Sequence, residues 1–167
     1  MIYRDATPAD AAVLHALYRE SFVATFGHLY APEDLARFFA PLTLEARIAE
    51  LEDPHCAFRI VEDAHGAAGY CKVGPLHLPA ATKGPALELD ELYLLDRAKG
   101  SGAAQTLMDW AIATARARGA AELWLSVYVD NHRAKRFYAR NGFEDRGPYA
   151  FMVGNHADED RLMRRAL

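Results

Sequence analysis

The feature of the sequence that most constrains its fold is an apolar strand followed, after a short glycine-containing turn, by a long helix. Residues 87–95 are typical of a buried strand, Lys99-Gly100-Ser101-Gly102 forms the turn, and apolar residues then recur at helical spacing. Backbone N–H groups in the first turn of a helix have no partner within the helix, and the helix dipole favours negative charge there. Small residues allow an anion to approach these groups. The unit therefore predicts a phosphate or diphosphate site.

Two common nucleotide-binding motifs do not match this turn. A P-loop requires GxxxxGK[ST], which the chain lacks, and a dinucleotide-binding fingerprint needs a third glycine where Gln105 stands. The alternative interpretation is a plain strand-to-helix turn in which the glycines serve only the backbone conformation.

The order of the remaining elements indicates one mixed α/β domain over residues 1–167. We expect strands at residues 2–4, 56–61, 67–73, 87–95, 123–129, 149–153 and 160–166, and helices that begin near residues 7, 32, 43, 102 and 131. No linker is long or polar enough to divide the chain.

Composition and charge limit the partners of such a domain. The 167 residues are 51% hydrophobic and carry a net charge of −4, which is typical of a globular protein and gives no bulk attraction to nucleic acid. Two cysteines do not form a disulfide framework, and no segment reads as a membrane span or a signal peptide. We therefore expect a cytoplasmic protein that binds neither nucleic acid nor membrane. The seven histidines lack metal-site spacing, which predicts no metal.

A second informative stretch lies between residues 131 and 143. Asn131 can cap a short helix on which Ala134, Phe137 and Tyr138 share a face. Taken singly, Tyr138 could be a core aromatic residue, and the basic residues of this helix could form a solvated face.

Together the two stretches resemble the GCN5-related N-acetyltransferase (GNAT) superfamily. The superfamily's Q/R-x-x-G-x-G/A turn falls on residues 99–104, with Lys99 in place of Gln or Arg, and a rival register begins at Arg97. Its N-x-x-A-x-x-F-Y and G-F motifs match residues 131–138 and 142–143 completely. A looser likeness to bacterial PaiA-type polyamine acetyltransferases rests on residues 26–35, 86–89 and 151–163.

The resemblance implies a central twisted, mostly antiparallel sheet with a splayed parallel pair and helices on both faces. Acetyl-CoA would lie where the strands that end near Leu95 and Val129 separate, with the acetyl carbonyl facing the N–H of Leu94. The residues that the resemblance assigns to the coenzyme are Leu92, Leu94, Lys99, Gly100, Ser101, Gly102, Ala103, Ala104, Asn131, Arg133 and Lys135.

The acceptor amine needs a base, because an alkylammonium has a pKa near 10.4. The strand at residues 87–95 offers Glu88, Asp90 and Glu91, and strict alternation would put Glu88 and Asp90 on one face and Glu91 on the other. We rank Glu88 and Asp90 about equally as the base. These acids could also simply bind water at a strand edge. By resemblance, Tyr138 would give a proton to the departing thiolate.

The expected activity is therefore direct acetyl transfer, in a ternary complex, from acetyl-CoA to a primary amine such as a polyamine or another small amine. Phe26, Tyr30, Glu33 and Glu91 are the candidate acceptor-binding residues. Two alternatives stay open: acetylation of a peptide N-terminus or lysine, and an acyl-CoA-binding module without catalysis. The protein could be a monomer or a homodimer.

Overall fold

The N-terminal part of the chain forms an edge strand and three helices. The computed structural model describes residues 1–167; β1 (Ile2–Asp5) is followed by α1 (Ala11–Phe26), α2 (Pro32–Phe39) and α3 (Leu44–Glu52). Pro8 opens a short 3₁₀ turn ahead of α1, and Pro32 is the first residue of α2. The Thr43 hydroxyl accepts a hydrogen bond of 3.1 Å from the N–H of Ala46, which caps α3. These starts agree with the sequence prediction.

The rest of the chain alternates between strands and two helices. Its elements are β2 (Ala57–Asp63), β3 (Gly66–Pro75), β4 (Ala86–Leu94), α4 (Ala103–Ala117), β5 (Glu122–Tyr128), α5 (His132–Arg140), β6 (Glu144–Val153) and β7 (His156–Ala166). None of the helices has the length and apolar character needed to cross a lipid bilayer.

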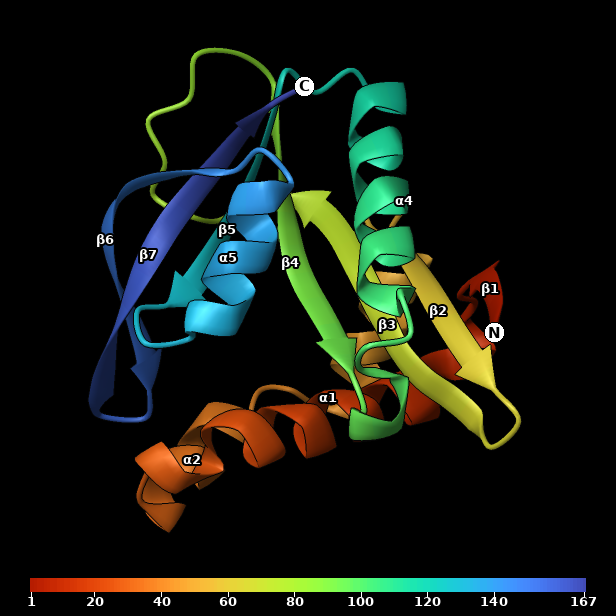
Figure 1. Cartoon of the computed structure of the whole chain (residues 1–167). Coiled ribbons are helices and arrows are strands. Elements are labelled where there is room, and N and C mark those ends of the chain that lie inside the picture. The colour runs from red at the N-terminus through yellow and green to blue at the C-terminus, as the bar shows by residue number, and fades with distance from the viewer.

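All seven strands belong to one sheet in the order β1-β2-β3-β4-β5-β7-β6. Every neighbouring pair is antiparallel except β4 and β5, which run parallel and pair only between Ala86–Glu88 and Glu122–Trp124. Beyond these residues the two strands diverge, as Figure 1 shows. The mostly antiparallel sheet with a splayed parallel pair is thus confirmed.

Helices cover both faces of this sheet (Figure 1). On one face, α4 and α5 pack on a core that includes Leu107, Leu123 and Leu125. On the other face, α1 and α2 pack on a second core that includes Leu14, Phe22 and Ile60. Because side chains alternate along a strand, each face of β5 presents a different set of residues to its helices.

A β-bulge in β4 changes which of its residues share a face. Lys72 of β3 lies opposite Glu91, and Val73 lies opposite Leu89, so Asp90 is an extra residue in β4. Leu89 packs on the α4 side, whereas Glu91 lies on the α1 side with Glu88. The predicted alternation, with Glu91 on the opposite face from Glu88 and Asp90, is therefore wrong, because it assumed an uninterrupted strand.

The two closing strands are longer than the sequence predicted. β6 begins at Glu144 rather than at residue 149, and β7 begins at His156 rather than at residue 160. β6 begins with the exposed polar residues Glu144, Asp145 and Arg146, followed by Gly147 and Pro148, and this composition hides its strand character. The longer hairpin carries Asp158 and its cross-strand partner Phe151 to the interior of the molecule.

Candidate active site

A cleft of about 670 Å³ opens where β4 and β5 separate. Because it passes through the gap in the sheet, both faces contribute to its lining. Leu92 and Tyr138 line it on the α4 and α5 side, and Glu88, Tyr30 and Asp160 line it on the α1 side. The two sides differ in charge: Lys99, Arg133 and Arg140 line the first, whereas carboxylates dominate the second.

The turn before α4 has the backbone geometry of an anion site. Gly100 and Gly102 have φ values of +80° and +88°, which glycine adopts without strain. The N–H groups of Gly100, Gly102 and Ala104 have no acceptor within the protein, whereas the N–H of Ala103 is bonded to the Ser101 hydroxyl at 3.3 Å. Three free donors at the start of a 15-residue helix can hold a diphosphate.

The basic residues near this turn have different surroundings. Lys99 lines the cleft, with its ammonium 2.6 Å from Asp96. Arg97 instead pairs with Asp63 at 2.7 Å, so the structure places Lys99, and not Arg97, at the cleft. The ammonium of Lys135 donates to the carbonyl of Val129 at 2.9 Å and lies outside the cleft lining.

The edge of β4 that faces the cleft is free for pairing. The N–H of Leu95 donates to the carbonyl of Ala68 in β3 at 2.9 Å and so points away from the cleft. Since backbone groups alternate in direction along a strand, those of Leu92 and Leu94 point the other way, toward the space that β5 leaves open. This edge can pair with an extended amide-containing ligand.

Helix α5 contributes Asn131 and Tyr138 to the same region. The Asn131 side chain accepts from the N–H of Ala134 at 3.2 Å and so caps the helix at the edge of the cleft. Tyr138 packs against the rings of Phe137 and Phe143 and lines the cleft. Burial raises the pKa of Tyr138, so its hydroxyl carries a proton at neutral pH and can donate it.

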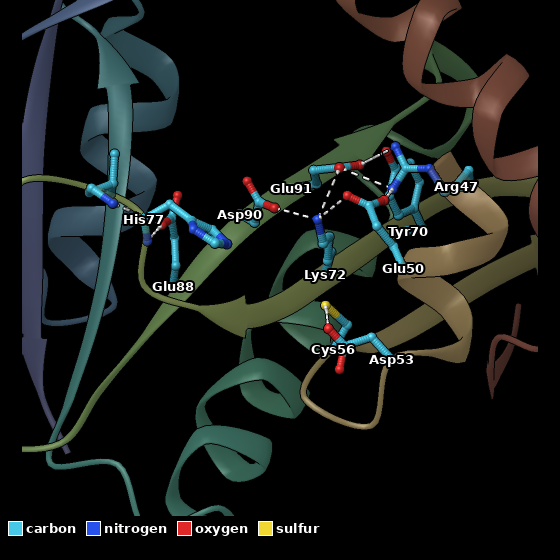
Figure 2. Close-up of polar contacts among 11 residues, drawn as sticks. Arg47, Glu50, Asp53, Cys56, Tyr70, Lys72, His77, Glu88, Asp90 and Glu91 are labelled. Atoms are coloured by element: carbon cyan, nitrogen blue, oxygen red, sulfur yellow. Dashed lines mark hydrogen bonds and ion pairs between the residues drawn. The ribbon is translucent and has the colours of Figure 1, made fainter. Parts of the chain in front are cut away.

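Glu88 is a buried carboxylate without a cationic partner. Its Oε2 accepts from the backbone N–H groups of His77 and Leu78 at 2.8 and 3.3 Å (Figure 2). Burial raises the pKa of Glu88, and the two N–H donors oppose that change. The residue is therefore fixed in orientation, and its basicity is greater than that of an exposed glutamate.

Asp90, by contrast, is neutralised by a lysine. The ammonium of Lys72 lies 2.5 Å from Oδ2 of Asp90 and 2.8 Å from Glu50 of α3. Figure 2 shows Asp90 between Glu88 and this group of ion pairs.

Glu91 is held still more firmly. Arg47 of α3 donates two hydrogen bonds to its carboxylate, at 3.0 and 3.1 Å, and the Tyr70 hydroxyl donates a third (Figure 2). All of these residues are buried. Glu91, predicted to bind the acceptor, lines the cleft and also connects α3 to the sheet, and both of its oxygens accept hydrogen bonds from protein side chains.

The predicted acceptor residues are only partly brought together. Phe26 and Tyr30 line the cleft, and the Tyr30 hydroxyl donates to Asp158. Glu33 is exposed in the first turn of α2 and lies outside the cleft lining.

The sequence analysis missed the two acids of β7. Asp158 and Asp160 are both buried and line the cleft. Burial, and then the charge of Asp158, raise the pKa of Asp160 to about 7. Their spacing of two residues was a usable signal, because it puts both on one face of a strand. However, the predicted strand began at residue 160 and so excluded Asp158.

Known proteins share this sequence pattern and this fold. The sequence profile of the Acetyltransferase (GNAT) family matches residues 12–143. An uncharacterized N-acetyltransferase of Mycobacterium tuberculosis is 36% identical over 159 residues, which cover 95% of this chain and 98% of the relative.

Two solved structures are similar along their whole length. A PaiA N-acetyltransferase from Thermoplasma acidophilum in complex with coenzyme A has a TM-score of 0.76 at 20% identity, covering 99% of this chain and 98% of the other. A ribosomal-protein-alanine N-acetyltransferase from Brucella melitensis has a TM-score of 0.77 at 25% identity, covering 100% of both chains.

Proposed function

The chain belongs to the acetyltransferase (GNAT) family, and from this premise we propose that it transfers acetyl from acetyl-CoA directly to the primary amine of a small molecule. The observation that carries the proposal is the cleft through the sheet. The turn with free N–H groups lies on one side of it, where Lys99 and Ala104 line the cleft, and a buried carboxylate without a cationic partner lies on the other. Both substrates can therefore meet in the gap between β4 and β5.

The coenzyme would bind along the α4 side of the cleft. Gly100, Gly102 and Ala104 offer their free N–H groups to the diphosphate, and Lys99 and Arg133 add positive charge. The exposed edge of β4 at Leu92 and Leu94 pairs with the amides of the pantetheine arm. The N–H of Leu94 is then available to the acetyl carbonyl as a hydrogen-bond donor.

Two proton transfers are assigned to residues of this chain. The acceptor ammonium must lose a proton before its nitrogen can attack, and at pH 7 this costs roughly 4–5 kcal/mol. We assign that proton to Glu88, directly or through water, because Lys72 neutralises Asp90 and Arg47 neutralises Glu91. As the nitrogen–carbon bond forms and the carbon–sulfur bond breaks, Tyr138 donates its hydroxyl proton to the departing sulfur. The proton that the nitrogen loses in becoming an amide then returns through water to Tyr138.

The test is release of free thiol from acetyl-CoA in the presence of different acceptors. The panel contains small amines, amino acids and a peptide with an N-terminal alanine, the last because one similar structure is a ribosomal-protein-alanine N-acetyltransferase. We expect turnover with small amines. Turnover with the peptide alone would instead assign the activity to peptide N-termini. Coenzyme binding without thiol release from any acceptor would identify a binding module.

A further inference from the structure

The acceptor side of the cleft has more negative charge than the reaction requires. Its two basic residues, Arg47 and Lys72, are already paired with Glu50, Asp90 and Glu91. Three more carboxylates line the same side without a Lys or Arg partner, namely Glu88, Asp158 and Asp160. Of these, Asp158 accepts from the Tyr30 hydroxyl and lies 3.1 Å from the His156 ring. The proton that the reacting amine gives up passes to Glu88 and neutralises that carboxylate alone, so Asp158 and Asp160 still lack a Lys or Arg partner when the amine reacts.

Asp160 is the most unusual of these carboxylates. It is only 6% exposed, forms no ion pair with any residue of the chain, and has the Ser126 hydroxyl as its polar neighbour. A buried carboxylate without a cation is costly, and it favours any ligand that supplies the missing positive charge.

Aromatic side chains surround this carboxylate. The strand register puts Tyr128 of β5 directly opposite Asp160 on one side and Tyr149 of β6 directly opposite it on the other. Cross-strand neighbours of this kind have Cβ atoms about 5 Å apart on the same face. Phe26 contacts Tyr128 edge-to-face at 6.1 Å and closes the site from α1. A carboxylate between aromatic faces is a favourable environment for an alkylammonium.

We propose that Asp160, together with Asp158 and flanked by Tyr128 and Tyr149, binds a second ammonium group of the acceptor, so that the preferred substrates are alkyl diammonium compounds. This second group keeps its proton throughout the reaction and supplies a positive charge opposite Asp160. The inference rests on the proposed acetyl transfer and names its substrate class.

The position of Tyr149 connects the two ends of such a substrate. Tyr149 lines the same cleft as Glu88 and lies directly opposite Asp160 in the strand register. A diamine can therefore extend past Tyr149, with one nitrogen at Glu88 and the other at Asp160.

The experiment compares three acceptors with the same four-carbon chain: 1,4-diaminobutane, 4-amino-1-butanol and n-butylamine. Binding to the enzyme–coenzyme A complex is measured by calorimetry, and kcat/KM is measured by thiol release from acetyl-CoA. We expect the diamine to exceed both monoamines in affinity and in kcat/KM by about 10- to 100-fold, the range for a hydrogen bond to a charged group. In 4-amino-1-butanol the second group is polar but uncharged, so this compound separates the effect of the second positive charge from that of polarity.

Two variants locate the effect. Asp160→Asn removes the charge with almost no change of shape and should abolish most of the preference for the diamine. Glu159→Gln makes the same change at the neighbouring exposed position of β7 and should keep it. Coenzyme A affinity reports whether each variant is folded, and Asp158→Asn serves as the second test if Asp160→Asn does not fold.

The outcomes separate this inference from the proposed function. Equal binding of all three acceptors to the wild type, or a preference that survives in both Asp160→Asn and Asp158→Asn, overturns the ammonium site. Selective binding of the diamine without thiol release supports the ammonium site and contradicts the proposed acetyl transfer.

Discussion

At the scale of single residues, neighbouring groups decide which acid of the cleft is free to react. Glu88, Asp90 and Glu91 lie within four positions of each other, but only Glu88 lacks a cationic partner. Identical chemical groups therefore have different roles, because α3 supplies Arg47 and β3 supplies Lys72. Tyr138 differs in a similar way from a core tyrosine, since its ring is packed against Phe137 and the residue also lines the cleft.

Tyr138→Phe tests the proposed proton donor. Loss of the hydroxyl should lower kcat by roughly 100-fold, because general acid catalysis contributes about 10²–10⁴-fold, while coenzyme A affinity changes little. Steady-state kinetics and calorimetry measure the two effects. Tyr3→Phe, on β1 and outside the cleft lining, is the matched control. Wild-type turnover in Tyr138→Phe would contradict the assignment.

The raised pKa of Asp160 predicts a pH-dependent stability. A pKa of about 7 in the folded state exceeds the value of about 3.9 for an unfolded aspartate, so the folded state binds this proton more tightly. The stabilisation that this proton gives is fully present below about pH 4 and is lost as the pH rises through 7. The free energy of unfolding decreases by at most about 4 kcal/mol over that range. Asp158, Ser126, Tyr128 and Tyr149 are the polar or titratable groups around it.

Asp160→Asn should therefore be more stable than the wild type at pH 8 and about as stable near pH 4. Urea denaturation at several pH values measures this difference. Glu159→Gln should show no comparable trend, since that side chain is exposed. A stability difference for Asp160→Asn that is constant across the range would contradict the raised pKa.

At the scale of the elements, the sequence predicts local features better than strand register. The glycine turn, the cap at Asn131 and the position of Tyr138 depend on residues close together in the chain, and the structure contains all three features. The bulge at Asp90 depends on how β3 pairs with β4, which no local pattern specifies. The missed acid Asp158 depends similarly on the pairing of β6 with β7.

The buried partners of these acids could not be predicted from the sequence, for a related reason. Arg47 and Lys72 are typical surface residues in the sequence, and their burial follows from the packing of α3 against the cleft side of the sheet. Charge neutralisation between segments distant in the chain is a property of the tertiary structure. The sequence could therefore identify Glu88, Asp90 and Glu91 as candidates but could not rank them.

The turn before α4 gives a prediction at this scale. Gly102→Ala should destabilise the protein by about 1–2 kcal/mol, because φ is +88° there, and should weaken coenzyme A binding about 10- to 100-fold through the disturbed N–H donors. Gly119→Ala, where φ is +79° at the other end of α4, should lose similar stability.

Thermal unfolding and calorimetry measure the two quantities for both variants. A Cβ at either glycine meets no protein atom within 4 Å, so steric conflict does not distinguish them. Equal losses of coenzyme affinity in the two variants would contradict the proposed role of the turn.

At the scale of the whole molecule, the coenzyme should stabilise the fold. It would fill the gap where β4 and β5 do not pair, and a ligand at 100 times its Kd adds about 2.7 kcal/mol to the free energy of unfolding. For a chain of this size, this corresponds to a rise in Tm of about 5–10 °C. Differential scanning calorimetry with coenzyme A measures it, and pantetheine, which lacks the diphosphate, should give a smaller rise. An unchanged Tm at saturating coenzyme A would contradict the site.

The sheet consists of two plates, one of strands β1–β4 and one of strands β5–β7. They are joined along a seam only three residues long on each strand, where Ala86–Glu88 pair with Glu122–Trp124. Glu88 belongs to the first plate, whereas Tyr138 and Asp160 belong to the second. The angle between the plates therefore sets the separation of the proposed proton acceptor from the proposed proton donor. A substitution at the seam that tilts one plate would change the rate of acetyl transfer without touching either substrate.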